Sequence, residues 1–156
     1  GSPYVTLYEM PSLGHLYGGP YQALRRVRNP RDADYHQKFR NPERYTLSWT
    51  GPELGSENRG RENGFAPYVH IDRFKLPERE VQTFNMWFVG NYLPSLAKIP
   101  EVIRTRRYLA MEGSPIHFVL HEFSHSTVVK GAEWKSLRTE FSGGTSGLYR
   151  RVIHAN

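Results

Sequence analysis

The stretch that most constrains the fold is residues 84–123, where helical spacing gives way to two alternating segments. Large apolar residues first recur at the spacing of an amphipathic helix, and they are Val81, Phe84, Phe88 and Tyr92. Pro94 then ends or kinks that helix. Residues 102–111 and 116–123 follow as alternating segments, separated by a Glu-Gly-Ser-Pro turn. The stretch therefore predicts a helix followed by a β-hairpin.

Flanking segments complete a regular unit. Residues 67–76 alternate and are expected to form a strand, and residues 78–91 carry the helix described above. After the hairpin, residues 132–141 predict a helix and residues 148–154 a last strand. The order from residue 67 onward is β-α-β-β-α-β, which is the arrangement of a ferredoxin-like α+β fold.

The first part of the chain resembles the back half of this unit. Residues 3–10, PYVTLYEM, align with residues 116–123, IHFVLHEF, and at the same offset residues 21–25 align with residues 134–138. Chance alignment of short pieces is the alternative explanation. The interpretation divides the chain into a partial β-α-β repeat, a glycine-rich linker and a complete repeat, which cover residues 3–50, 51–66 and 67–156.

A four-stranded sheet with helices on one face leaves its other face bare, and that face must be buried. A second sheet packed against it would do so. We therefore expect a dimeric α/β-barrel, in which the second sheet comes from the partial repeat or from another copy of the chain. The expected assembly is a homodimer or an intramolecular pseudo-dimer.

Strand alternation assigns each side chain to one of two faces, although a one-residue slip would reverse the assignment. The apolar residues expected to face the helices are Val5, Leu7, Val69, Ile71, Phe118 and Leu120. The residues expected to face the barrel interior include Tyr4, Tyr8, Tyr68, His70, Asp72, Phe74, His117 and His121. This lining has more capacity for proton transfer than an apolar interior requires.

The catalytic candidates are His70, Asp72, His117 and His121. Histidine titrates near neutral pH, and a neighbouring carboxylate fixes its tautomer and raises its basicity. We expect one histidine to act as a base with Asp72 orienting it. The alternative is that these histidines are structural groups or lie at an exposed barrel mouth. The substrate-binding candidates are Tyr4, Tyr8, Tyr68, Phe74, Trp87, Asn91 and Tyr92.

The central stretch also resembles a known family. Its residues Phe84-x-x-Trp87-Phe88, Asn91-Tyr92-Leu93-Pro94 and Ile99-Pro100, followed by Arg106-Arg107-Tyr108, are similar to the EthD-like branch of the dimeric α/β-barrel superfamily. The resemblance covers about residues 68–154. EthD-like proteins commonly carry Trp-Tyr-x-x-x-His-Leu-Pro, and Tyr92 stands where that pattern has histidine. A tyrosine hydroxyl there suits a proton donor better than a base.

The resemblance implies cofactor-free cyclases, decarboxylases, dehydratases, isomerases or monooxygenases that act on aromatic or polyketide-like molecules. The superfamily also includes haem enzymes and proteins without known activity, so the fold does not settle the function. Taken together, the resemblance and the polar lining of the expected interior favour a cofactor-independent lyase, cyclase or isomerase of secondary metabolism. Such an enzyme would work by acid–base catalysis in a barrel pocket. The alternative is a non-catalytic carrier of a small hydrophobic molecule.

Composition narrows the other function classes. The chain has 156 residues and no cysteine, which excludes a disulfide scaffold and any thiolate site. Its net charge of +6 fits a basic surface, an anionic small ligand or nucleic acid. The arginine clusters lack the aromatic strand motif of RNA-binding domains, so no nucleic-acid partner is expected. No segment has the length of a membrane span, and a cytoplasmic protein without membrane contact is expected.

Histidine spacing also bears on metal binding. His117, His121 and His125 have the spacing of helical ligands, but their segment is expected to be a strand. Residues four apart on a strand are about 13 Å apart and cannot share one ion. The sequence therefore predicts neither a metal site nor a cofactor.

Overall fold

The structure is a computed structural model that describes residues 4–27, 29–54, 64–139 and 144–152. The chain divides into two compact units. One comprises Gly1–Val5 and Tyr45–Asn156, and the other comprises Thr6–Arg44. The larger unit holds the sheet and the histidine and aspartate candidates.

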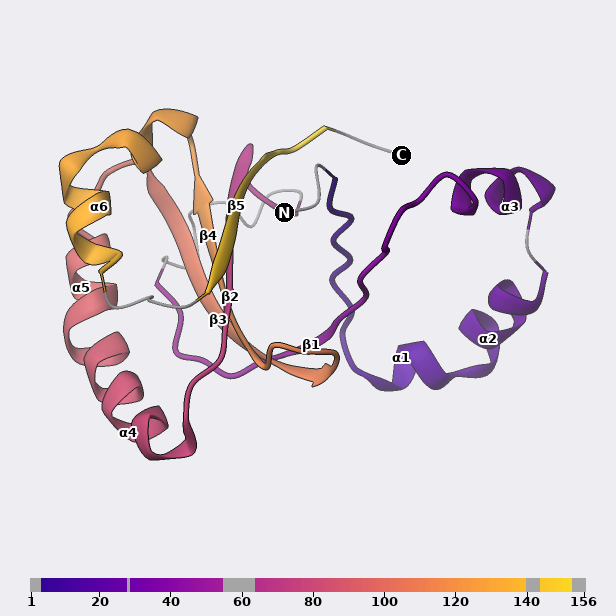
Figure 1. Cartoon of the computed structure of the whole chain (residues 1–156), viewed down its shortest axis with the longest axis horizontal. Coiled ribbons are helices and arrows are strands. Elements are labelled where there is room, and N and C mark those ends of the chain that lie inside the picture. Colours follow the sequence, from indigo (N-terminus) through magenta and orange to yellow (C-terminus); the bar gives the residue numbers. More distant parts are fainter. Residues whose placement is uncertain (1–3, 28, 55–63, 140–143, 153–156) are drawn as a thin grey trace. The chain divides into compact units, whose positions relative to one another are not determined.

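The larger unit is built on one five-stranded antiparallel sheet (Figure 1). Its strands are β1 (Thr46–Trp49), β2 (Tyr68–Phe74), β3 (Val102–Glu112), β4 (His117–Phe123) and β5 (Thr145–Arg150). Their order across the sheet is β1-β3-β4-β2-β5. The last four strands and their helices have the predicted β-α-β-β-α-β order, and the architecture is consistent with a ferredoxin-like α+β fold. β1 adds a fifth strand beside β3.

Helices lie on one face of this sheet (Figure 1). The first is α4 (Glu78–Trp87), which continues through a π-helical turn (Phe88–Tyr92) into α5 (Leu93–Leu96). The second is α6 (Ala132–Leu137), preceded by a 3-10 turn (Ser126–Lys130). Pro94 lacks an N–H and its ring crowds the carbonyl four residues earlier, which explains why the helix widens before it.

The smaller unit contains α1 (Gly14–Tyr17), α2 (Gly19–Arg26) and α3 (Pro30–His36). α2 supplies a helix within the part of the chain that was interpreted as a partial β-α-β repeat. The strand predicted over residues 3–10 is wrong, because residues 4–10 form neither strand nor helix. An alternating sequence is compatible with a β-strand, but a stable strand also needs backbone hydrogen bonds to a neighbouring strand. The proposed counterpart of β4 therefore does not form a strand in the described residues.

The predicted sidedness of the strands is also wrong. The histidine and aspartate side chains share the helix-covered face, because His70 and His121 pack against Trp134 of α6 and Phe74 packs against Phe84 of α4. All seven residues of β4 are buried, including Phe118 and Leu120 on the opposite face. A strand buried on both faces gives no polar–apolar alternation from which sidedness can be inferred.

The packing of the hydrophobic core explains why the histidines lie on the helix-covered face of the sheet. Large side chains of the same alternation set as the histidines fill the space under the helices, and they are Phe74, Val119 and Phe123. They meet Phe84, Phe88 and Trp134 from the helices. Because side chains two apart share a face, burying these residues carries His70, Asp72 and His121 into the same layer.

Candidate functional site

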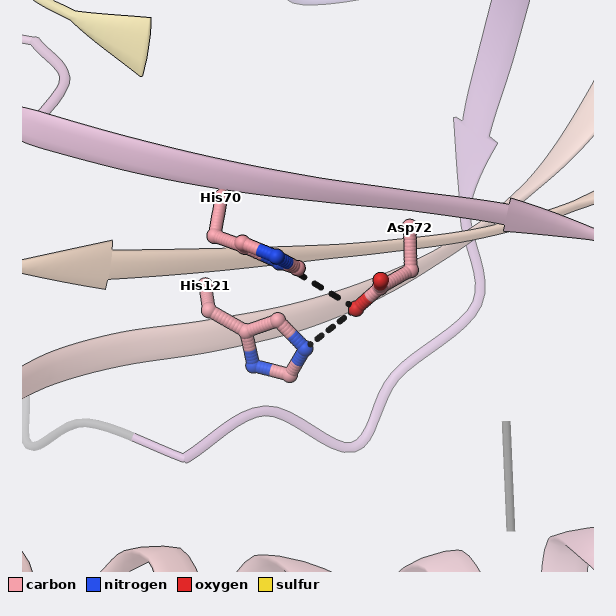
Figure 2. A group of neighbouring side chains, drawn as sticks. All are labelled: His70, Asp72 and His121. Carbon is pink, nitrogen blue, oxygen red and sulfur yellow. Dashed lines mark hydrogen bonds and ion pairs between the residues drawn. The ribbon is translucent and has the colours of Figure 1, made fainter. Parts of the chain in front are cut away.

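The candidate site is centred on the Asp72 carboxylate of β2 (Figure 2). Its Oδ2 lies 3.0 Å from Nε2 of His121 on β4 and 3.4 Å from Nδ1 of His70 on β2. Register brings the histidines together, since His70 and His121 are directly opposed in the β2–β4 pair. All three residues are buried, and His121 is completely covered. Burial of a carboxylate requires such compensating partners.

Arg138, immediately after α6, supplies the charge that Asp72 needs. Its Nη1 donates to Oδ2 and its Nη2 donates to Oδ1, so the guanidinium grips both carboxylate oxygens. The same guanidinium stacks over the Trp134 ring at 5.2 Å. Sequence reasoning missed this role, because Arg138 was noted only as the last residue of the aligned range 134–138. No local pattern links a residue after a helix to a strand 66 positions earlier.

The Asp72 carboxylate is strongly held in its charged form. Burial alone would raise its pKa, but hydrogen bonds from His121 and His70 outweigh burial and hold the pKa of Asp72 well below its ordinary value. Asp72 is therefore ionised throughout the neutral range. It orients and polarises the imidazoles and does not itself carry the proton.

His121 is the most enclosed member of the cluster. Burial lowers the pKa of His121 to about 4, although its hydrogen bond with Asp72 acts in the opposite direction. Its Nδ1 lies 3.1 Å from Oγ1 of Thr105 on β3. A neutral imidazole that donates from Nε2 to Asp72 and accepts the Thr105 hydroxyl proton at Nδ1 satisfies both contacts.

Tyr92 closes the cluster from the helix side. Its hydroxyl lies 3.4 Å from Nε2 of His121, and its ring is fully buried. Burial raises the pKa of Tyr92 above its ordinary value, so the phenol stays protonated at neutral pH. Tyr92 is the last residue of the π-helical turn, a feature frequent at functional sites.

His70 is the imidazole best placed to act as a base. A proton on Nδ1, directed at the Asp72 carboxylate, leaves the lone pair on Nε2 available. Unlike His121, His70 retains some exposure, 7% against 0%. Its ring meets Trp134 edge-on at 5.3 Å, which fixes its plane. The arrangement places a buried carboxylate beside an imidazole whose ring plane is fixed and whose residue keeps a small exposed fraction.

A small polar recess opens beside the carboxylate. It has a volume of about 30 Å³, which is room for one or two water-sized groups. Its walls come from Asp72, Arg73, Phe74, Arg138, Gly144, Thr145 and Ser146. The β5 backbone comes close here, since a side chain at Gly144 would meet the Arg73 carbonyl oxygen at 2.8 Å. The recess reaches Asp72 and Arg138, but the histidines are not among its walls.

The structure separates His117 from the other catalytic candidates. His117 lies opposite Phe74, four residues along β4 from His121. Its Nδ1 is 3.3 Å from Nη2 of Arg107, and its ring stacks on Phe74. Burial and the Arg107 charge lower the pKa of His117. His117 therefore belongs to a second polar group on the same face.

The substrate-binding candidates are scattered. Phe74 is a core residue, Tyr68 is half-buried, and Asn91 is exposed. Trp87 is half-buried, and its ring lies 4.8 Å from that of Tyr92. Tyr4 and Tyr8 are 84% and 81% exposed and line no interior, because residues 4–10 do not form the predicted strand.

The cluster is also a candidate metal centre that sequence spacing did not reveal. His70, Asp72 and His121 each offer one ligand atom, and these atoms lie within 4.8 Å of one another. Two histidines and one carboxylate suit iron and zinc. However, both oxygens of Asp72 accept from Arg138, whose positive charge opposes a second cation at this point. The donor set fits proton transfer better than metal binding.

Comparisons with protein-family models, curated proteins and solved structures gave no match. The EthD-like resemblance therefore stays a prediction. Within the described residues, no helix combines the length and the apolar character needed to cross a bilayer.

Proposed function

We propose that the chain is a cofactor-independent acid–base enzyme, a lyase, cyclase or isomerase that acts on an aromatic or polyketide-like small molecule. The observation that supports this proposal is the buried Asp72 carboxylate, which is shared by two imidazoles and held by Arg138. Perturbed, mutually coupled ionisable groups of this kind concentrate at active sites. Its placement on the helix-covered face changes the expected site but not this chemistry.

The proposed mechanism assigns one role to each group. Nε2 of His70 accepts a proton from an acidic carbon next to a carbonyl group, while Asp72 stabilises the imidazolium that forms. Charge develops on the carbonyl oxygen of the substrate, and a neutral phenol such as that of Tyr92 donates to it. His70 then returns the proton to a second position or to the leaving group, which gives isomerisation or elimination.

The proposal includes a barrel formed by two copies of the chain, and it is supported by exposed apolar side chains on the face of the sheet away from the helices. Its large apolar side chains include Trp49 and Ile116, both more than half exposed. A second copy of the chain packed sheet to sheet would cover them. Sedimentation velocity tests this: a dimer that dissociates on Trp49→Glu substitution is expected, and a monomer at all concentrations would contradict the barrel.

The function is tested by turnover of enolisable aromatic ketones and polyketide-like β-diketones. We expect His70→Gln to lower kcat by about 100-fold or more, because general-base catalysis contributes at least that much. His15→Gln is the matched control, since His15 lies in α1 of the smaller unit. Equal turnover in the wild-type and His70→Gln proteins would refute His70 as the base.

The pH profile separates the enzyme from the carrier. A base-driven enzyme shows a limb in kcat/KM on the acidic side, which His70→Gln removes. A carrier binds the same compounds without turning any of them over. Binding without turnover across the compound set would support the carrier and overturn the catalytic proposal.

A further inference from the structure

A second polar group on the helix-covered face surrounds Arg107 of β3. Arg107 is only 7% exposed. Its Nη1 donates to Oδ1 of Asn85 on α4, and its Nη2 lies 3.3 Å from Nδ1 of His117. Its guanidinium also lies over the rings of Phe84 and Phe88, at 4.9 and 5.7 Å. These partners are all neutral.

The contrast with the neighbouring arginines is informative. On the other face of β3, Arg104 and Arg106 both bond the buried Glu122 carboxylate. In the described part of the chain, no carboxylate pairs with Arg107, and this is the difference between it and the two neighbouring arginines. Nε of Arg107 is also buried and makes no hydrogen bond within the described residues. A buried charge without a counter-charge is costly, and a bound anion would remove that cost.

The remaining donors point to the kind of anion. Because Arg107 donates to Nδ1 of His117, the imidazole proton resides on Nε2, which can donate in turn. Asn85 is exposed, so the group reaches the protein surface, and its amide adds a further donor. One fixed positive charge with flat N–H donors and aromatic walls suits a carboxylate on an aromatic body.

We propose that Arg107, His117 and Asn85 form a binding site for the carboxylate of a small aromatic acid. Asp72, Val119 and Arg107 occupy one cross-strand row, so the two polar groups lie two strands, or about 10 Å, apart. The assignment of this acid as the substrate rests on the proposed function, whereas binding of the anion does not.

The test is calorimetric titration of the full chain with benzoate, its neutral counterpart benzamide, and inorganic phosphate. We expect benzoate to bind and to weaken at high salt, with benzamide and phosphate at least about tenfold weaker. Arg107→Gln should weaken benzoate by about tenfold or more and leave benzamide unchanged. Equal affinity for benzoate and benzamide, tighter binding of phosphate, or no loss in Arg107→Gln would overturn the site.

A second variant keeps the test decisive if Arg107→Gln does not fold. Asn85→Asp places a carboxylate beside Arg107 at an exposed position and should block benzoate, while Asn85→Ala should reduce binding only slightly. Benzoate bound by Asn85→Asp as tightly as by the wild type would refute the proposal. His15→Gln, in α1 of the smaller unit, should retain full benzoate affinity, and a loss there would show that the losses in the other variants are not specific to Arg107. Because no turnover is measured, failure of the acid–base mechanism leaves this result unaffected.

Discussion

Arg138 donates to both carboxylate oxygens of Asp72, a contact that ties the end of α6 to the middle of β2. The pair is enclosed, since the Asp72 side chain is 3% exposed and the Arg138 side chain 17%. It anchors the helix layer to the sheet at the point where the two histidines meet. Asp72 thus serves both the fold and the candidate site.

Removal of Arg138 should therefore destabilise the protein and disturb the site. We expect Arg138→Gln to lower the free energy of unfolding by about 3 kcal/mol, because it leaves Asp72 charged without its cation. The Asp72→Asn/Arg138→Gln double variant should recover part of this loss. Urea denaturation of Arg138→Gln, Asp72→Asn, the double variant and the wild type gives the coupling energy directly. Additive losses would show that the pair contributes no mutual stabilisation.

Sequence reasoning could find the members of this cluster but not its surroundings. His70 and Asp72 are two apart on a strong strand, and His121 lies on a strand with equally clear β character, so grouping the three required only local pattern. The face that they occupy is set by the packing of Phe74, Phe123 and Trp134 in the core. These contacts join residues that are distant in the sequence, so no local pattern predicts them. Arg138 and Thr105 are brought in by helix placement and strand register, which no short-range spacing encodes.

The failure at residues 3–10 has a similar cause. The segment alternates as well as β4 does, yet β4 is hydrogen-bonded to β2 and β3, whereas residues 4–10 pair as a strand with none of the described residues. An alternating sequence indicates that a segment can pair as a β-strand, but it does not show that a partner strand is present. The similarity between residues 3–10 and 116–123 therefore does not extend to strand formation in the described residues. The division into a partial and a complete repeat stays a prediction.

Stability should fall between pH 6.5 and 4 because of His121. The folded state holds the pKa of His121 at about 4, whereas in the unfolded chain it has its ordinary value of 6.5. Between these values the unfolded state binds more protons, so stability rises with pH and is lost as the pH falls toward 4. The full effect is at most about 3 kcal/mol. Urea denaturation at several pH values measures it, and His121→Gln should show a shallower pH dependence. An unchanged slope in that variant would refute this account.

Protonation of Asp72 should cause a second loss of folding stability at lower pH. Its pKa is lowered on folding, so its contribution is present above the unfolded value of 3.8 and disappears as the pH falls through the lower folded value. Asp72→Asn should therefore flatten the stability curve below about pH 4, whereas His121→Gln acts mainly above that pH. A variant pair with indistinguishable curves would mean that the two groups do not titrate as assigned.

Metal removal should leave the activity unchanged. The proposed chemistry uses only imidazole, carboxylate and phenol groups, and Arg138 occupies the lone pairs of Asp72 that a metal would need. Dialysis against EDTA followed by turnover and elemental analysis provides the measurement. Loss of activity that added iron or zinc restores would instead assign His70, Asp72 and His121 as metal ligands. Arg138→Gln, which frees the carboxylate, should raise the zinc affinity of the cluster.

The largest single loss of stability is expected at Glu122, on the face away from the helices. Its carboxylate is 1% exposed, accepts from Arg104 and Arg106, and also accepts the backbone N–H of Ala66. Glu122→Gln leaves two enclosed guanidinium groups without a counter-charge and should cost about 3–5 kcal/mol. Glu80→Gln is the matched control, because Glu80 pairs with Arg79 in solvent, where such pairs contribute at most about 1 kcal/mol. Equal urea midpoints for the two variants would show that the Glu122 cluster is no more important than a surface pair.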